Sequence, residues 1–66
     1  MKATFNKASR ELKIEENRRK YVYDVDELPF TSLIEIEGEI YDVCLDWDGE
    51  RHLLFVNDIL EELTVE

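Results

Sequence analysis

Apolar residues alternate with polar ones on both sides of Gly38, and this pattern constrains the fold more than any other feature of the chain. Glycine readily opens a type II′ turn, so a two-residue Gly38-Glu39 loop predicts a hairpin that pairs Ile36 with Tyr41. Because side chains alternate between the two faces of a strand, this register gathers the apolar residues on one face. The residues of that predicted inner face are Ile34, Ile36, Tyr41, Val43, Leu45 and Trp47.

A second hairpin is predicted at Asp48-Gly49, because this pair readily adopts the positive φ angles of a type I′ turn. The strand that follows runs from Arg51 to Asn57. A two-residue turn would place His52, Leu54 and Val56 on the inner face and point Leu53 and Phe55 outwards. A three-residue loop with a bulge would reverse the two sets, and both registers stay open. Either way the strand is apolar on both faces, which indicates that it is covered on both.

The first third of the chain predicts a shorter hairpin and one further strand. Ala3 to Phe5 and Leu12 to Ile14 flank the polar segment Lys7 to Arg10, which is typical of two paired strands and their loop. The run Tyr21 to Asp26 alternates again and predicts another strand. Pro29 predicts an extended or turning link after it, because proline donates no hydrogen bond to a ladder.

The last nine residues predict a helical turn and a short strand. Asp58 to Glu61 has the form of a capping box, in which an acidic N-cap is followed three residues later by Glu. Ile59, Leu60 and Leu63 would then share one side of a turn or two of helix. We expect the segment Leu63 to Glu66 to return as a last short strand.

Together these segments predict a mainly β fold: a small antiparallel β-barrel or meander of about five to six short strands with one short C-terminal helical turn. With 66 residues and no Pro, Gly or Ser-rich linker, a single domain over residues 1–66 is expected. The one cysteine, Cys44, excludes an internal disulfide, so the fold depends on a thin apolar core. A lone thiol without a signal peptide or membrane span favours a cytoplasmic location.

The order of strands and turns from Arg19 to Glu66 also carries a resemblance. Its best part is "SLIEIEGEIYDVCLDWDGERHLLFVNDILEELTVE". This stretch resembles the small SH3-like barrel domains found as uncharacterised proteins of Gram-positive bacteria and their phages or mobile elements. The resemblance implies an SH3-like barrel, and because such barrels serve many functions it implies no particular activity.

The net charge of −9 is distributed unevenly along the chain. Residues 1–20 carry seven basic and three acidic side chains, whereas residues 21–66 carry fourteen acidic side chains and one base, Arg51. That many carboxylates would repel the phosphates of nucleic acid, so direct nucleic-acid binding is not expected. The longest apolar run, Leu53 to Val56, is far too short to cross a membrane. We therefore expect a protein partner.

Few residues favour catalysis or a cofactor. Cys44 and His52 would come close only in the bulged register, and a thiol–imidazole pair also needs an orienting third group. Structural zinc needs four N or S ligands, of which the chain offers these two. Paired carboxylates such as Asp46 and Asp48 would need a cleft that so small a domain is not expected to form. We predict a non-enzymatic protein with no catalytic residue, metal site or cofactor.

The carboxylates of the hairpins lead to one hypothesis of function. In the predicted register Glu35 lies opposite Asp42, and such a like-charge pair costs roughly a few tenths to 1 kcal/mol, which favours a use for the charge. The acidic face would imitate the phosphates of nucleic acid and bind a basic surface on a nucleic-acid-handling protein, as a phage or mobile-element inhibitor would. Its predicted residues are Glu35, Glu37, Asp42, Asp46 and Asp48.

A second hypothesis needs no mimicry. The outward side chains of Ile40, Leu53 and Phe55 would form an apolar patch that binds another protein or a second copy of the chain, with the charge as a rim. A simpler alternative is that the charge only keeps the protein soluble. Salt separates the first two hypotheses, because a charge mimic loses affinity steeply as salt rises and an apolar interface does not.

Overall fold

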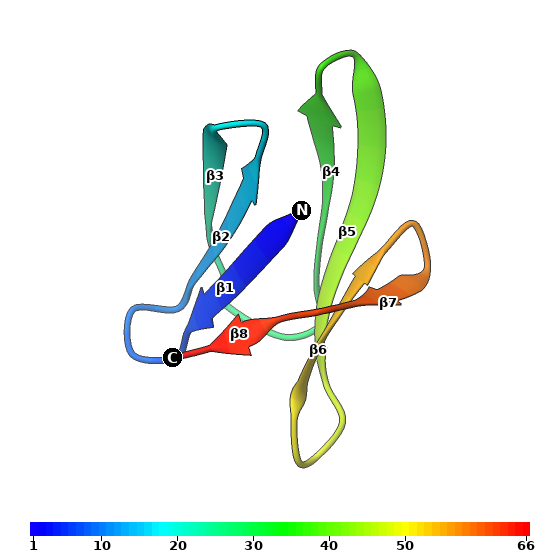
Figure 1. The fold of residues 1–66 in the computed structure, drawn as a ribbon. Helices are drawn as coiled ribbons and strands as arrows, with labels where there is room; N and C mark the ends of the chain where they lie inside the picture. Colours follow the sequence, from blue (N-terminus) through cyan, green and yellow to red (C-terminus); the bar gives the residue numbers. More distant parts are fainter.

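The computed structural model describes all of residues 1–66 and contains eight β-strands and no helix (Figure 1). In chain order the strands are β1 (Lys2–Asn6), β2 (Glu11–Glu16), β3 (Arg19–Asp24), β4 (Phe30–Ile36), β5 (Glu39–Trp47), β6 (His52–Val56), β7 (Ile59–Glu61) and β8 (Thr64–Val65). The mainly β fold is therefore confirmed, and the prediction of about five to six strands falls short of the eight found.

The strands form two four-stranded sheets. Sheet A has the order β3-β2-β1-β8 and sheet B the order β4-β5-β6-β7. All pairings are antiparallel except the one between β1 and β8. In Figure 1, the chain leaves sheet B after β7 and crosses to sheet A, where β8 forms the edge strand beside β1.

The predicted meander is present within each sheet, but the barrel is not closed. Closure would require ladders between β3 and β4 and between β7 and β8, and the chain pairs neither. Residues 25–29 join β3 to β4 and include a cis Leu28–Pro29 peptide bond, and residues 62–63 join β7 to β8. The sheets are thus linked by the chain on both sides without being hydrogen-bonded into one barrel.

The core lies between the inner faces of the two sheets and is entirely apolar. No polar or charged side chain is buried. Five of the core side chains have no exposed surface at all: Leu12, Ile14, Val43, Leu45 and Leu54. The remaining members of the core are Ala3, Phe5, Val25, Ile34, Ile36 and Val56.

The hairpin of β4 and β5 turns one residue earlier than predicted. Glu37 and Gly38 occupy the turn with φ angles of 51° and 83°, which is a type I′ turn, and Ile34 rather than Ile36 pairs with Tyr41. This moves the register by two residues, so every side chain keeps its predicted face. Glu35 consequently lies opposite Ile40, and the predicted pairing of Glu35 with Asp42 is wrong.

The inner face of this hairpin follows the prediction with one exception. Ile34, Ile36, Val43 and Leu45 are buried, and Tyr41 is half-buried against the core. Trp47, by contrast, is 46% exposed, because it ends β5 beyond the reach of the hydrophobic cluster.

The loop from β5 to β6 has four residues, 48–51, in place of the predicted two-residue turn. The Asp48 carboxylate accepts hydrogen bonds from the backbone N–H groups of Glu50 at 2.8 Å and Arg51 at 2.7 Å, which stabilises the longer loop. Trp47 therefore pairs with His52, and again the register differs by an even number of residues. The face assignment of the two-residue alternative holds: Leu54 and Val56 are buried, and His52 shares their face.

The predicted helical turn at Asp58 to Glu61 is wrong. Asn57 and Asp58, with φ angles of 52° and 65°, form a type I′ turn, and β7 then runs antiparallel to β6. Asn57 is also tied to β5, because its side-chain oxygen accepts from the Asp42 N–H at 2.9 Å and its own N–H donates to the Asp42 carbonyl at 2.8 Å. The turn preference of Asn57 and Asp58 therefore overrides the capping-box pattern at this point of the chain.

The remaining predictions for the two ends of the chain are confirmed. Strands β1 and β2 form a hairpin around residues 7–10, and β3 occupies most of the Tyr21 to Asp26 run. The expected last strand is β8, which pairs with β1 in parallel and is held by hydrogen bonds between Glu66 and both Phe5 and Lys7.

Truncation of Leu54 tests the dependence of the fold on its core. Leu54 has no exposed surface, so Leu54→Ala should lower the free energy of unfolding by about 2 to 5 kcal/mol. Leu33→Ala removes the same side chain from a position that is 71% exposed and should change that free energy by less than about 0.5 kcal/mol. Urea unfolding followed by tryptophan fluorescence measures both, and equal losses would contradict the described core.

Substitution of Asn57 tests the turn that replaces the predicted helix. Asn57→Gly keeps the positive φ angle but loses the bond to the Asp42 N–H, and should cost about 1 kcal/mol of stability. Asn57→Ala loses that bond and adds backbone strain, so it should cost about 1 to 2 kcal/mol more. A helical turn with Asp58 as its N-cap would instead leave Asn57 outside the helix and without this bond, so both variants would then cost little, and thermal unfolding distinguishes the two outcomes.

Candidate functional site

The outer face of sheet B is the surface on which the sequence-predicted site residues meet. One row of this face crosses all four strands through Thr31, Cys44, Phe55 and Leu60, each opposite the next in the ladder. Leu33, Ile40 and Leu60 are 71%, 65% and 60% exposed, which is unusual for large apolar side chains. Leu53, Phe55 and Cys44 lie between them and are half-buried. The face is therefore apolar at its centre and open to solvent.

Carboxylates interrupt this apolar surface at regular points. Three of the predicted acidic residues are on the face, and each lies opposite an apolar side chain on the neighbouring strand. The pairs are Glu35 with Ile40, Asp42 with Leu33, and Asp46 with Leu53. No Lys or Arg stands in any strand of sheet B, so no base of the sheet neutralises them. The two predicted sets, acidic and apolar, thus form one interleaved surface.

The other two predicted acidic residues are in turns at opposite ends of β5 and do not belong to the face. The Glu37 carboxylate accepts a hydrogen bond from the Asn17 side chain at 2.9 Å, which connects the β4–β5 turn to the β2–β3 turn. The Asp48 carboxylate organises its own loop, and the backbone N–H groups of Arg51 and Glu50 hold the pKa of Asp48 below its ordinary value. Both carboxylates therefore have local structural partners.

Two members of the face were missed by sequence reasoning. Leu60 was assigned to a helix, although recognition of Asn57-Asp58 as a two-residue turn would have placed it opposite Phe55. Leu33 stands on the same side of β4 as Glu35, and its alternation with Ile34 already indicated an outward position.

Cys44 lies on this outer face, whereas His52 points to the inner side of the sheet. The two side chains are on opposite faces and form no thiol–imidazole pair. Burial raises the pKa of the Cys44 thiol, and the carboxylates of Asp46, Asp42 and Asp58 raise it further. The thiol is accordingly held in its protonated, less nucleophilic form.

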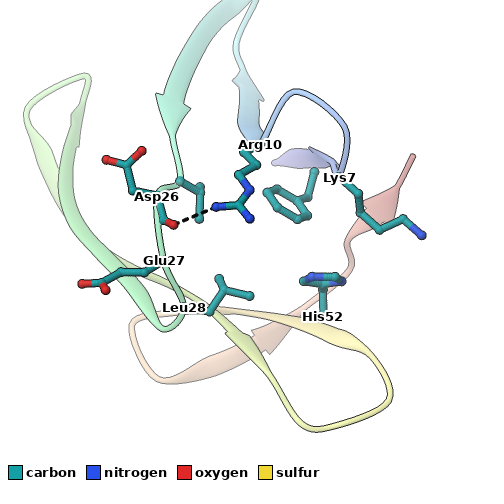
Figure 2. A pocket seen from close by; sticks show the side chains of 8 residues that line it. Lys7, Arg10, Asp26, Glu27, Leu28 and His52 are labelled. Atoms are coloured by element: carbon teal, nitrogen blue, oxygen red, sulfur yellow. Dashed lines mark hydrogen bonds between the residues drawn. The ribbon is translucent and has the colours of Figure 1, made fainter.

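A second feature lies at the end of the molecule where the β1–β2 loop meets the start of β6. The His52 ring is 4.9 Å from the Phe5 ring and 4.6 Å from the Trp47 ring, measured between centroids, so it is held between two sheets. Beside it a pocket of about 390 Å³ opens between the loop, the β3–β4 link and β6 (Figure 2). The sequence did not predict this pocket, because its residues come from three segments that are distant in the chain.

Comparisons with protein-family models, with curated proteins and with solved structures found no match to this chain. The structure contains no helix of the length and hydropathy needed to span a membrane. The class defined by fold and site is therefore an all-β domain of two small sheets with one acidic and apolar outer face.

The reactivity of Cys44 tests this environment. Because its pKa is raised, its thiolate fraction near neutral pH is below that of a free thiol, and alkylation by iodoacetamide should be several-fold slower than that of glutathione. The rate should reach its plateau at a higher pH than for the free thiol. Unfolding in urea should remove the difference, and a native thiol as fast as glutathione would contradict the described environment.

Proposed function

We propose that the chain is a protein-binding domain, and that the outer face of sheet B binds a basic and partly apolar surface on another protein. The observation that carries this proposal is the alternation of exposed apolar side chains with unneutralised carboxylates on that face. Exposed apolar surface of this kind is typical of interaction sites, and charge complementarity selects the partner.

A heterologous partner is favoured over a second copy of the chain. A symmetric dimer through this face would place the same acidic patch on both sides of the interface, and sheet B has no strand Lys or Arg to offset the repulsion. Like charges forced together in an interface disfavour a wrong partner by several kcal/mol. A basic partner turns the same carboxylates into favourable contacts.

The partner class that fits best is a nucleic-acid-handling protein, whose basic surface exists to attract phosphates. The carboxylates of the face would occupy the place of those phosphates, and Leu33, Ile40 and Phe55 would add apolar contact that nucleic acid lacks. In this role the domain is an inhibitor of the kind that a phage or mobile element uses. A reducing, cytoplasmic setting suits its free thiol.

The alternative function is an interaction module or homodimer that uses only the apolar side chains. The high exposure of Leu33, Ile40 and Leu60 favours it, since burial of such surface contributes roughly 25 cal/mol per Å². This alternative predicts a binding affinity that does not change when the carboxylates of the face are neutralised.

A matched pair of triple variants separates the two. Glu35→Gln, Asp42→Asn and Asp46→Asn together neutralise the outer face of sheet B. Glu11→Gln, Glu15→Gln and Asp24→Asn make the same change in net charge on the outer face of sheet A. Proteins retained by the immobilised chain from an extract of its source cell are identified, and the affinity of the purified partner is measured.

The first triple variant should bind the partner at least about tenfold more weakly at low salt, because the complementary charges are lost. The second should bind as the parent chain does. Binding should weaken steeply above roughly 0.15 M salt, and a nucleic-acid duplex should displace the chain. Equal binding by both variants together with salt-independent self-association would reject the mimic and support the dimer.

A further inference from the structure

The pocket at the open end of the two sheets lies away from the outer face of sheet B and has a different chemistry. Its apolar wall consists of Phe5, Val25 and Leu28, which come from β1 and from the β3–β4 link. Its polar wall includes Arg10 from the β1–β2 loop and His52 from β6. The volume of about 390 Å³ falls in the range of small-molecule sites.

The charged side chains around this pocket point in different directions. In Figure 2 the Arg10 guanidinium extends into the pocket, while the carboxylates of Asp26 and Glu27 and the ammonium group of Lys7 point away from it. Arg10 Nη1 donates to the backbone carbonyl of Asp26 at 3.0 Å, and the guanidinium retains further N–H donors. The inward charge is therefore positive, although the protein as a whole is strongly acidic.

Contacts within the protein position the two polar groups of the pocket: the Asp26 carbonyl holds the Arg10 guanidinium, and hydrogen bonds hold the backbone of its loop. The Arg10 carbonyl accepts from the Val25 N–H at 2.8 Å, which ties the loop to the β3–β4 link. The Asn6 side chain accepts from two N–H groups of the same loop, those of Ala8 and Ser9. The neighbouring rings of Phe5 and Trp47 restrict the orientation of the His52 ring. A preorganised site binds with less loss of conformational entropy.

We propose that this pocket binds a carboxylate that carries an apolar side group. The carboxylate accepts from the free N–H donors of Arg10, whose planar fork suits a carboxylate, and the apolar group packs on Phe5 and Leu28. The His52 ring closes one side and can donate or accept a hydrogen bond. The carboxylates of Asp26 and Glu27, which line the pocket, point away from it in Figure 2, whereas Arg10 acts at contact distance. Repulsion from the other acidic residues is screened over roughly 8 Å at physiological salt.

Such a carboxylate has two sources: a free small acid, or the C-terminal residue of a peptide. Phenylacetate represents the first, and N-acetyl-phenylalanine represents the second. N-acetyl-phenylalanine amide keeps the ring and lacks the charge, so it reports how much the carboxylate contributes.

Titration of the ¹⁵N-labelled chain with the three probes at physiological salt tests the proposal. Phenylacetate, N-acetyl-phenylalanine or both should shift the amide signals of Arg10, Val25 and His52 in a saturable way, and the amide probe should bind at least about tenfold more weakly. Saturation by N-acetyl-phenylalanine alone would assign the site to peptide C-termini, and comparable saturation by phenylacetate to free acids.

Arg10→Gln should weaken the binding of the carboxylate probes about tenfold, since it removes the charge and the fork. Lys13→Gln is the matched control, because it makes the same change in charge on the outer face of sheet A and should bind as the parent chain does. Unchanged amide dispersion shows that both variants fold. Failure of both carboxylates to bind, or equal weakening by the two variants, would overturn the proposal and leave the role of sheet B untouched.

Discussion

The fold depends on one constraint, the burial of the inner faces of two small sheets against each other. The core contains no polar side chain, and the only cysteine is free, so neither a buried hydrogen-bond network nor a disulfide contributes to it. A domain of 66 residues has a thin core in which each buried side chain counts for a large share of stability. Because side chains alternate along a strand, the two neighbours of every inward-facing residue point to the outer face.

This constraint explains why acidic and apolar residues share the outer face of sheet B. The inner positions of β4, β5 and β6 are taken by the core, and what remains between them is Leu33, Glu35, Ile40, Asp42 and their neighbours. The pairing of each carboxylate with an apolar residue avoids direct like-charge contact across the ladder. The arrangement keeps an apolar surface accessible and discourages contact between two copies of it.

The pocket beside Arg10 follows from the open ends of the same architecture. Trp47 and His52 have the parity of core residues and lie at its edge: Trp47 is 46% exposed, and the half-buried His52 ring packs between it and Phe5 of sheet A, so the two rings form the rim of the core. The β1–β2 loop and the β3–β4 link meet there and bring a guanidinium to apolar walls. The acidic outer face and the cationic pocket thus occupy separate parts of one small domain.

Much of the fold was predictable from local patterns. The alternation around Gly38 assigned Ile34, Ile36, Val43 and Leu45 to the core, and the same rule placed Leu54 and Val56 there under one of the two open registers. These assignments survived two errors in the turns, because both registers moved by an even number of residues and side chains repeat with a period of two. The exposure of Trp47 was not predictable, since parity does not reveal where the opposing sheet ends.

The sequence by itself determined which side chains of β4 and β5 face inwards, because alternation along a strand is a local property, but it left two registers open for β6. Only the tertiary structure decided how the strands combine. The local pattern at Asn57-Asp58 allows a turn or a capping box, and the hydrogen bond to Asp42, fifteen residues away, favours the turn through which Leu60 joins the outer face. Arg10 and His52 line one pocket although they are far apart in the chain. Such placements depend on hydrogen bonds and packing between distant segments, which no local pattern encodes.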